Sequence, residues 1–176
     1  MNVKEVILVD ENDNQTGIME KMEAHRLGLL HRAFSVFIFN NEGSMLIHQR
    51  ATGKYHGGGL WTNACCSHPM PGEEADVAAS RRLMQEMGIA CPLQHAFTFT
   101  YKAAVENGLT EHEIDHVYTG VYHGNPQHDS DEVQDWKWMP LQELKNDMEA
   151  RPQHYTTWFR IALPLLEEHL PIQVIK

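Results

Sequence analysis

The sequence predicts an α+β fold, with one mixed β-sheet and a few flanking α-helices, in a single domain that covers residues 1–176. Three observations support this prediction. Short apolar runs of strand length recur along the chain, whereas few segments show the helical spacing of apolar residues. No internal repeat or low-complexity linker divides the sequence. The length of 176 residues suits one domain with a sizeable core.

The first sixty or so residues are predicted to be mostly strands and turns. The run from Arg32 to Phe39 is apolar, aromatic and β-branched, which is typical of a central strand. Turn residues at 40–43 follow it and predict that 44–50 returns as its hairpin partner. Three glycines within 54–59 favour a loop, because glycine costs backbone entropy inside a strand. The strands predicted here are 5–10, 15–21, 32–39 and 44–50.

The rest of the chain is predicted to alternate between helices and strands. Residues 73–87 have apolar side chains at roughly helical spacing (Val77, Ala78, Leu83, Met84 and Met87), and Gly88 is a typical C-cap residue. Two more helices are predicted at 141–149 and 155–169, the second broken at Pro164 because proline lacks the backbone N–H. Strands are predicted around 93–101, 112–122 and 133–138.

Composition excludes several classes of partner. The formal net charge of −10 argues against sequence-independent binding to nucleic acid, which requires clustered Lys and Arg. No apolar run approaches the ~18–20 residues that span a bilayer, and the N-terminus does not resemble a signal peptide. Three cysteines, two of them adjacent, argue against a disulfide framework. We therefore expect a cytoplasmic protein with no membrane partner.

The segment Trp61–Pro69 brings a thiol and an imidazole together. Cys66 and His68 would point to the same side if the segment is extended, because side chains alternate along a strand. A lone cysteine is more often a small buried apolar residue, but the neighbouring His68 favours a functional thiol. Further along, Glu111 and Glu113 would likewise share one face of a strand, with His112 pointing away. Proton transfer beside a metal ion is the chemistry that these groups suggest.

The predicted helix at 73–87 resembles the helix of the Nudix box, and Glu73, Arg81, Leu83, Glu86 and Gly88 match that pattern. The match is incomplete, because Ser67 stands where the box has glycine and Arg82 and Gln85 stand where it has glutamates. A hydrolytic site with several metal ions needs those glutamates. Glu86 alone could still supply a carboxylate to one Mg²⁺ on a diphosphate. The alternative is an exposed amphipathic helix with an Arg82–Glu86 pair at i, i+4.

The helix, the Trp-Thr-Asn-x-x-Cys-x-His-Pro segment and Glu111-His112-Glu113 occur in the order found in type I isopentenyl diphosphate isomerases, a family of the Nudix superfamily. The sequence resembles this family from Val6 to about Trp158. The resemblance implies a Nudix-like mixed β-sheet sandwiched by a few α-helices. It also implies that a proton is added to isopentenyl diphosphate and another removed, which gives dimethylallyl diphosphate for isoprenoid biosynthesis.

The resemblance assigns roles to residues by their position. The catalytic thiol, carboxylate and assisting phenol correspond to Cys66, Glu113 and Tyr101, with Glu113 expected to donate a proton and Cys66 to accept one. The residues that match the family's ligands of a tightly held divalent ion (Mn²⁺, Zn²⁺ or Mg²⁺) are His25, His31, His68, Glu111 and Glu113. Glu86 matches the residue that meets Mg²⁺ on the substrate diphosphate. The matching substrate contacts are Lys21, Arg50, Lys54, Arg82 and Trp158.

The reaction that the family catalyses explains these residue types. Protonating an alkene creates a tertiary cation, which the face of a tryptophan such as Trp61 or Trp158 can stabilise. One acid and one base are needed on opposite faces of the substrate. Arg50 and Lys54 flank the glycine-rich loop and suit a diphosphate, although a solvated loop with incidental charges is the plainer alternative. The other eight histidines, His56 among them, have no such support and are expected to be structural or exposed.

Two other functions remain as alternatives at this stage. One is a Nudix hydrolase of a nucleoside or prenyl diphosphate, which would not require the Cys66, Tyr101 and Glu113 set. The other is a non-catalytic module that binds a metal or a diphosphate. A small prenyl diphosphate is the expected partner, and the sequence leaves open whether the protein is a monomer or a homodimer.

Overall fold

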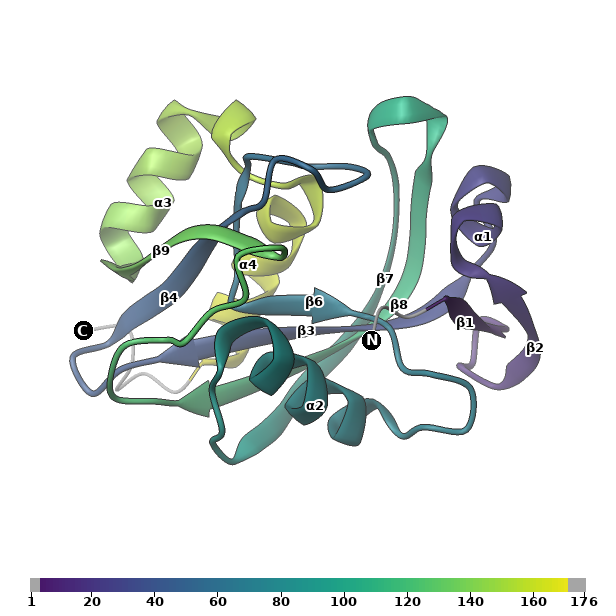
Figure 1. The fold of residues 1–176 in the computed structure, drawn as a ribbon, viewed down its shortest axis with the longest axis horizontal. Helices are drawn as coiled ribbons and strands as arrows, with labels where there is room; N and C mark the ends of the chain where they lie inside the picture. The colour runs from purple at the N-terminus through teal and green to yellow at the C-terminus, as the bar shows by residue number, and fades with distance from the viewer. Residues whose placement is uncertain (1–3, 171–176) are drawn as a thin grey trace.

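The computed structural model describes residues 4–170, which form one mixed sheet with helices on both faces (Figure 1). The strands are β1 (Glu5–Val9), β2 (Gln15–Glu20), β3 (His31–Phe39), β4 (Ser44–Arg50), β5 (Trp61–Thr62), β6 (Cys65–Ser67), β7 (Leu93–Ala104), β8 (Thr110–Val121) and β9 (Val133–Pro140). The helices are α1 (Lys21–Leu27), α2 (Ala75–Met87), α3 (Leu141–Ala150) and α4 (Thr157–His169). Two short 3₁₀ helices are η1 (Glu106–Gly108) and η2 (Pro152–His154). The predicted α+β class is confirmed.

Strand β3 is the centre of the sheet, as its apolar sequence predicts. It pairs in parallel with β8 along its whole length and antiparallel with β6. The expected hairpin with β4 is reduced to a single pair, Phe39 with Met45. Beyond this pair β4 leaves β3 and pairs antiparallel with β9 instead. The predicted β3–β4 hairpin is therefore present but limited to the turn, because a local turn does not specify the partner of the rest of the strand.

Two hydrophobic cores lie on opposite faces of the sheet. Phe34, Val36 and Ile38 of β3 pack on one face with Leu83 and Met87 of α2. The alternate residues of β3, Phe37 and Phe39, pack on the other face among the side chains of α3 and α4. Figure 1 shows α2 on one side of the sheet and α4 on the other. A strand buried on both faces explains why β3 has no polar alternation in its sequence.

Helix α1 was missed by the sequence analysis, which extended the preceding strand to Lys21. The Glu20 side chain accepts hydrogen bonds from the backbone N–H groups of Met22 and Glu23, at 3.0 and 2.8 Å, and so caps the helix start. Gly28 ends the helix with a φ of 63°, a left-handed conformation that favours glycine. The seven residues of α1 carry His25 into the protein interior, where its side chain is buried.

Helices α2 and α4 confirm the predicted segments but differ in detail. Val77 and Met84 of α2, predicted on its apolar face, are exposed, whereas Arg82 and Glu86 are buried. Helix α4 runs without a break through Pro164. Pro164 lies on the exposed face of α4, while Phe159, Leu163 and Leu166 hold the opposite face in the core. Packing of that face outweighs the backbone hydrogen bond that proline removes.

Within residues 4–170, none of the helices has the length and apolar character needed to cross a bilayer.

Candidate active site

The register of four neighbouring strands places the predicted catalytic residues side by side. Ser35 of β3 pairs with Cys66 of β6, and His31 of β3 pairs with Glu113 of β8. Tyr101 of β7 pairs with the same Glu113 from the other side. Residues from four separate segments therefore meet at one place on the sheet. The order of the strands, β6-β3-β8-β7, creates this meeting point.

Five buried side chains converge next to this point, and they are the five that the resemblance matches to the tightly held divalent ion. Each offers one ligand atom, and all of these atoms lie within 4.8 Å of one another. The set consists of His25, His31, His68, Glu111 and Glu113. Three of its buried polar atoms, His25 Nε2, His31 Nε2 and Glu111 Oε2, have no hydrogen-bond partner among the described residues. Unpaired nitrogen and carboxylate atoms that converge in this way fit a divalent cation.

Backbone carbonyls set the orientation of two of these imidazoles. His25 Nδ1 lies 2.6 Å from the carbonyl oxygen of Lys21, and His31 Nδ1 lies 2.8 Å from that of Leu29. A carbonyl only accepts hydrogen bonds, so Nδ1 of each ring carries the hydrogen. In a neutral ring Nε2 then carries the lone pair and is the nitrogen available to a cation, as in histidine ligands whose other nitrogen is held by a second group.

Neighbouring imidazoles favour the charged form of the two buried glutamates. Burial and the Glu113 carboxylate raise the pKa of Glu111, but contacts with His25 and His56 outweigh them and hold that pKa below its ordinary value. Burial likewise raises the pKa of Glu113, yet His31 and His68 hold it well below the ordinary range. Two carboxylates in one interior site repel each other. A cation between them would relieve this repulsion.

Glu113 divides its two oxygens between different neighbours. Oε1 lies 2.9 Å from His68 Nε2 and 3.4 Å from His31 Nε2, inside the cluster. Oε2 accepts a hydrogen bond of 2.7 Å from the Tyr101 hydroxyl. The carboxylate thus faces the cluster with one oxygen and a small cavity with the other, since Tyr101 and Glu113 both line that cavity.

Cys66 also lines this cavity and is held in place by a chain of polar side chains. Its thiol donates to Asn63 Oδ1 at 3.0 Å, and its sulfur lies 3.4 Å from Ser35 Oγ. The Ser35 hydroxyl in turn donates to Asp115 at 2.7 Å. Burial, followed by the Asp115 carboxylate, raises the pKa of the Cys66 thiol. In the free protein Cys66 is therefore a neutral thiol.

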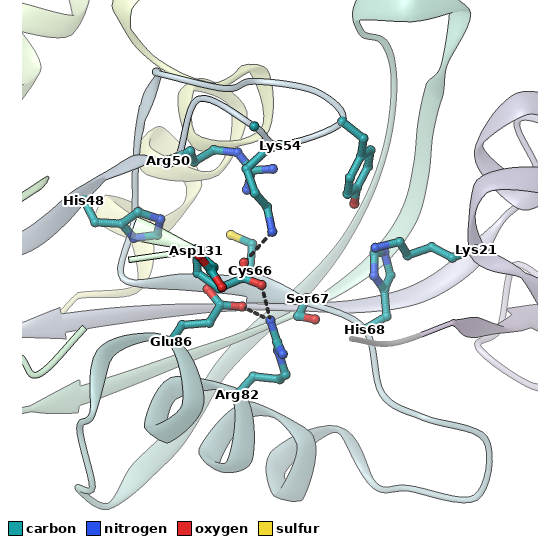
Figure 2. A pocket seen from close by; sticks show the side chains of 13 residues that line it. Lys21, His48, Arg50, Lys54, Cys66, Ser67, His68, Arg82, Glu86 and Asp131 are labelled. Carbon is teal, nitrogen blue, oxygen red and sulfur yellow. Dashed lines mark hydrogen bonds and ion pairs between the residues drawn. The ribbon is translucent and has the colours of Figure 1, made fainter. Parts of the chain in front are cut away.

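A larger cavity of about 310 Å³ adjoins the small one and is lined by four basic side chains together with Glu86, Asp131 and Glu132. Figure 2 shows the cations around it: Lys54 and Arg50 come from β4 and the loop after it, Arg82 from α2, and Lys21 from the start of α1. All four were predicted substrate contacts. Residues that line both cavities, and so join them, are Arg50, Tyr55, Cys66, Ser67 and His68.

Carboxylates hold two of these cations in position. Arg82 pairs with Glu86 and lies 3.7 Å from Glu132, and Lys54 forms a close ion pair with Glu132. The Arg82–Glu86 pair is buried, so the interpretation of α2 as an exposed amphipathic helix was wrong at this pair. Burial raises the pKa of Glu86, with Arg82 opposing it. Lys21 loses its proton at a lower pH than an ordinary lysine does, because burial and then Lys54 lower its pKa to about 8.

Trp158 of α4, which the resemblance matches to a substrate contact, lines the small cavity. Its ring lies 5.1 Å from the Arg50 guanidinium and 5.2 Å from the His56 ring. Gly57 allows this approach: it has a φ of +60°, and a Cβ there would lie 3.3 Å from the Trp158 ring. Trp61, the other candidate, instead packs under Lys137, whose Nζ is 4.5 Å from its ring.

Two residues at the site were missed. His56 was expected to be structural or exposed, but it is buried and its Nε2 lies 2.5 Å from Glu111 Oε1. Glu132 was not singled out, although it pairs with Lys54 at the larger cavity. Neither lies in a periodic or motif-like segment. A histidine inside the glycine-rich loop was the only signal for His56 in the sequence.

Comparison with solved structures defines the class of fold. The chain is similar to DR0079 from Deinococcus radiodurans, with a TM-score of 0.71 and 18% identity over 83% of this chain and 89% of that one. It is also similar to the MutT protein from Methanosarcina mazei Go1, with a TM-score of 0.65 and 16% identity over 79% and 94% of the two chains. The family model described as NUDIX domain matches residues 29–159.

Comparison with curated sequences is more specific. Isopentenyl-diphosphate Delta-isomerase 2 of Aromatoleum aromaticum is 50% identical over 90% of this chain and 84% of its own. Isopentenyl-diphosphate Delta-isomerase of Pectobacterium atrosepticum is 49% identical over 96% and 94%. The chain belongs to the Nudix superfamily and, within it, to the isopentenyl-diphosphate Delta-isomerase family.

Proposed function

We propose that this protein isomerises isopentenyl diphosphate to dimethylallyl diphosphate. One observation carries the proposal: the Cys66 thiol and the Tyr101–Glu113 pair line the same small cavity, next to a larger cavity rich in cations. Isomerisation requires this combination, a proton donor and a proton acceptor around a short carbon chain whose diphosphate is held nearby. The relatives named above agree with this assignment.

The larger cavity binds the diphosphate. Arg50, Lys54 and Arg82 would contact its oxygens, and Lys21 would add a fourth positive charge. Binding of a diphosphate replaces the Lys54–Glu132 pair with stronger interactions, because an anion with several charges attracts the lysine more than one carboxylate does. Positioning in this cavity directs the carbon chain toward Cys66, which borders both cavities.

Two proton transfers in the small cavity move the double bond. One group adds a proton to the terminal carbon, which leaves a positive charge on the tertiary carbon. The other group removes a proton from C2, and the electron pair of the broken C–H bond forms the new double bond. The face of Trp158 stabilises the intermediate positive charge. The numbers of atoms and charges are unchanged overall, so no external reactant is consumed.

The assignment of donor and acceptor stays a prediction. The expected order has Glu113, assisted by Tyr101, as the donor and Cys66 as the acceptor. Without a bound cation the surroundings favour the opposite protonation states, because burial raises the pKa of Cys66, whereas the imidazoles of His31 and His68 outweigh burial and hold the pKa of Glu113 low. The expected order therefore requires that Glu113 be protonated and Cys66 deprotonated when substrate is bound.

Divalent cations complete the proposed site. The cluster of His25, His31, His68, Glu111 and Glu113 would hold one ion, Mn²⁺, Zn²⁺ or Mg²⁺, and Glu86 would meet the Mg²⁺ that accompanies the diphosphate. Such ions, when bound, supply positive charge that fixes carboxylates and neutralises phosphate oxygens. Glu113 belongs to the cluster and also lines the reaction cavity, so its ligation and its role in proton transfer are linked.

Hydrolysis of the diphosphate is less well supported. Arg82 and Gln85 occupy positions where the Nudix box has glutamates, and Arg82 pairs with the remaining Glu86. Glu73, the other matching glutamate, is taken up by an ion pair with Arg81 at 2.7 Å. On α2 and the segment before it, Glu86 is thus the carboxylate that lines the diphosphate cavity. A hydrolytic site with several metal ions lacks its ligands.

Proton NMR of the purified protein with isopentenyl diphosphate and Mg²⁺ in D₂O tests the proposal. Isomerisation gives dimethylallyl signals with deuterium in the methyl group, because the protons of both transfer groups exchange with solvent. Release of inorganic phosphate without a dimethylallyl product would support the hydrolase instead. If protein shown to contain metal bound the substrate but formed no product, the protein would be a binding module and not an enzyme for this substrate.

A further inference from the structure

His56 is a buried polar side chain near the site that has no role in the proposed reaction. It lies in the loop between β4 and β5, and 5% of its surface is exposed. Its Nε2 is 2.5 Å from Glu111 Oε1, and the side chains of both residues are almost fully enclosed. Neither ring nitrogen makes an aligned hydrogen bond among the described residues. An imidazole buried in this way requires a partner, and Glu111 is within reach.

The two carboxylates of the cluster are arranged alike. Oε1 of Glu113 lies beside the histidines of the cluster, and its Oε2 accepts a hydrogen bond from the Tyr101 hydroxyl. Oε2 of Glu111 lies in the cluster, 3.2 Å from His25 Nε2, and its Oε1 contacts His56. In each case one oxygen is left for a cation and the other is held from outside by a group that can donate a proton. His56 therefore contacts the oxygen of Glu111 that points away from the cluster, in the same way that Tyr101 contacts that of Glu113.

The loop that carries His56 is anchored on both sides. The Arg50 side chain donates to the carbonyl oxygen of His56 at 3.1 Å. On the other side, Asn107 of η1 donates to the carbonyl oxygen of Tyr55 at 2.9 Å, and the N–H of Gly57 lies 3.3 Å from Glu106 Oε2. The His56 ring also packs edge-on against Tyr55 and Trp158, with ring centres 4.3 and 5.2 Å apart. These contacts fix the ring over Glu111.

We propose that His56 is a positioning residue of the metal site, which donates from Nε2 to Oε1 of Glu111 and so presents Oε2 to the cation. The proposal rests on the metal cluster of the proposed function. A carboxylate that is free to rotate can offer either oxygen, whereas one held by a second group is already oriented for the ion. Partners of this kind change metal affinity by about 10- to 100-fold when they are removed.

The proposal distinguishes His56 from a sixth ligand. The five atoms of the cluster lie within 4.8 Å of one another, and His56 does not belong to that set. The cation would therefore be held by the five residues already described, with His56 behind one of them. Because His56 lies two residues after Lys54 and is contacted by Arg50, the same loop serves the diphosphate cavity and the metal cluster.

Titration with Mn²⁺, followed by the EPR signal of the free ion, measures the affinity of the cluster without any substrate. We expect His56→Leu, which keeps an apolar body against Trp158, to weaken Mn²⁺ binding by about 10- to 100-fold. His56→Gln, which keeps a donor, should recover most of the loss. Thr52→Ala, an exposed position of the same loop, is the control and should bind as wild type does. A folded His56→Leu with wild-type affinity would overturn the proposal.

A second measurement needs no variant and so does not depend on whether His56→Leu folds. Long-range ¹H–¹⁵N NMR of the wild-type protein loaded with Zn²⁺ reports which ring nitrogen of each histidine carries hydrogen. We expect a hydrogen on Nε2 of His56 and on Nδ1 of His25 and His31. A neutral His56 with hydrogen on Nδ1 alone would contradict the proposal. An absence of isomerase activity in the wild type would refute the proposed reaction but would change neither metal result.

Discussion

Tyr101 lies directly across the sheet from Glu113, and its hydroxyl donates a 2.7 Å hydrogen bond to the glutamate oxygen that faces the reaction cavity. The contact follows from strand pairing, since Tyr101 on β7 and Glu113 on β8 are cross-strand partners. Burial, followed by Glu113, raises the pKa of Tyr101 well above its ordinary value. The phenol therefore stays protonated and remains a donor at neutral pH.

Tyr101→Phe should reduce kcat by about 10- to 100-fold, because it removes this donor and leaves the ring in place. KM for isopentenyl diphosphate should change little, since the phenol lines the small cavity and is not among the residues that line the cation-rich one. Steady-state kinetics would separate the two parameters. A rise in KM with an unchanged kcat would place Tyr101 in substrate binding.

The adjacent cysteines offer a matched pair of variants. Cys66→Ala should lower kcat by about a thousandfold, because it removes one of the two proposed proton-transfer groups. Cys65→Ala is the control: Cys65 is fully buried in the core on the α2 face and is not among the residues that line either cavity. It should keep its activity within a few fold and lose some thermal stability. Equal activity of Cys66→Ala and wild type would exclude the proposed mechanism.

The strands and the catalytic face of the site could be predicted from the sequence because they depend on local periodicity. Alternation along 110–121 places Glu111 and Glu113 on one face of β8, and His112 points away to the carbonyl oxygen of Gly28. The resemblance supplied the rest of the ligand set. The sequence could not reveal that β8 lies parallel to β3, although this pairing brings His31 beside Glu113.

What was missed depends on short segments and on contacts between distant loops. Helix α1 has seven residues, too few for a clear apolar period, and its signals are the Glu20 cap and Gly28. His56 stands alone among glycines, and its position over Glu111 is set by contacts with Arg50 and η1. Such contacts join parts of the chain that no local pattern connects.

Binding of a diphosphate should weaken as the pH rises through about 8, the value to which burial and Lys54 lower the pKa of Lys21. Lys21 is charged below this pH and loses its charge above it, so the attraction for an anion falls on the alkaline side. Calorimetry with inorganic pyrophosphate at about pH 7 and about pH 9 would measure the effect.

The ionisation of the ligand itself cancels in a comparison with Lys21→Arg, whose guanidinium stays charged. Wild type should lose about tenfold more affinity than this variant between the two pH values. Equal losses would show that Lys21 does not contribute its charge.

Removal of the metal should destabilise the fold, because a cation held by the buried cluster binds the folded protein and not the unfolded chain. An ion present at a hundred times its dissociation constant adds about 2.7 kcal/mol to the free energy of unfolding. For a chain of this size, that corresponds to a rise of about 5–10 °C in Tm. Differential scanning calorimetry of protein stripped with a chelator and then reloaded with Mn²⁺ would show the difference.

His31→Gln is the control: it removes one ligand whose Nε2 lies 3.4 Å from Glu113, so its Tm should respond much less to Mn²⁺. If the stripped and reloaded wild-type proteins melted at the same temperature, the five residues would not form a metal site that stabilises the fold.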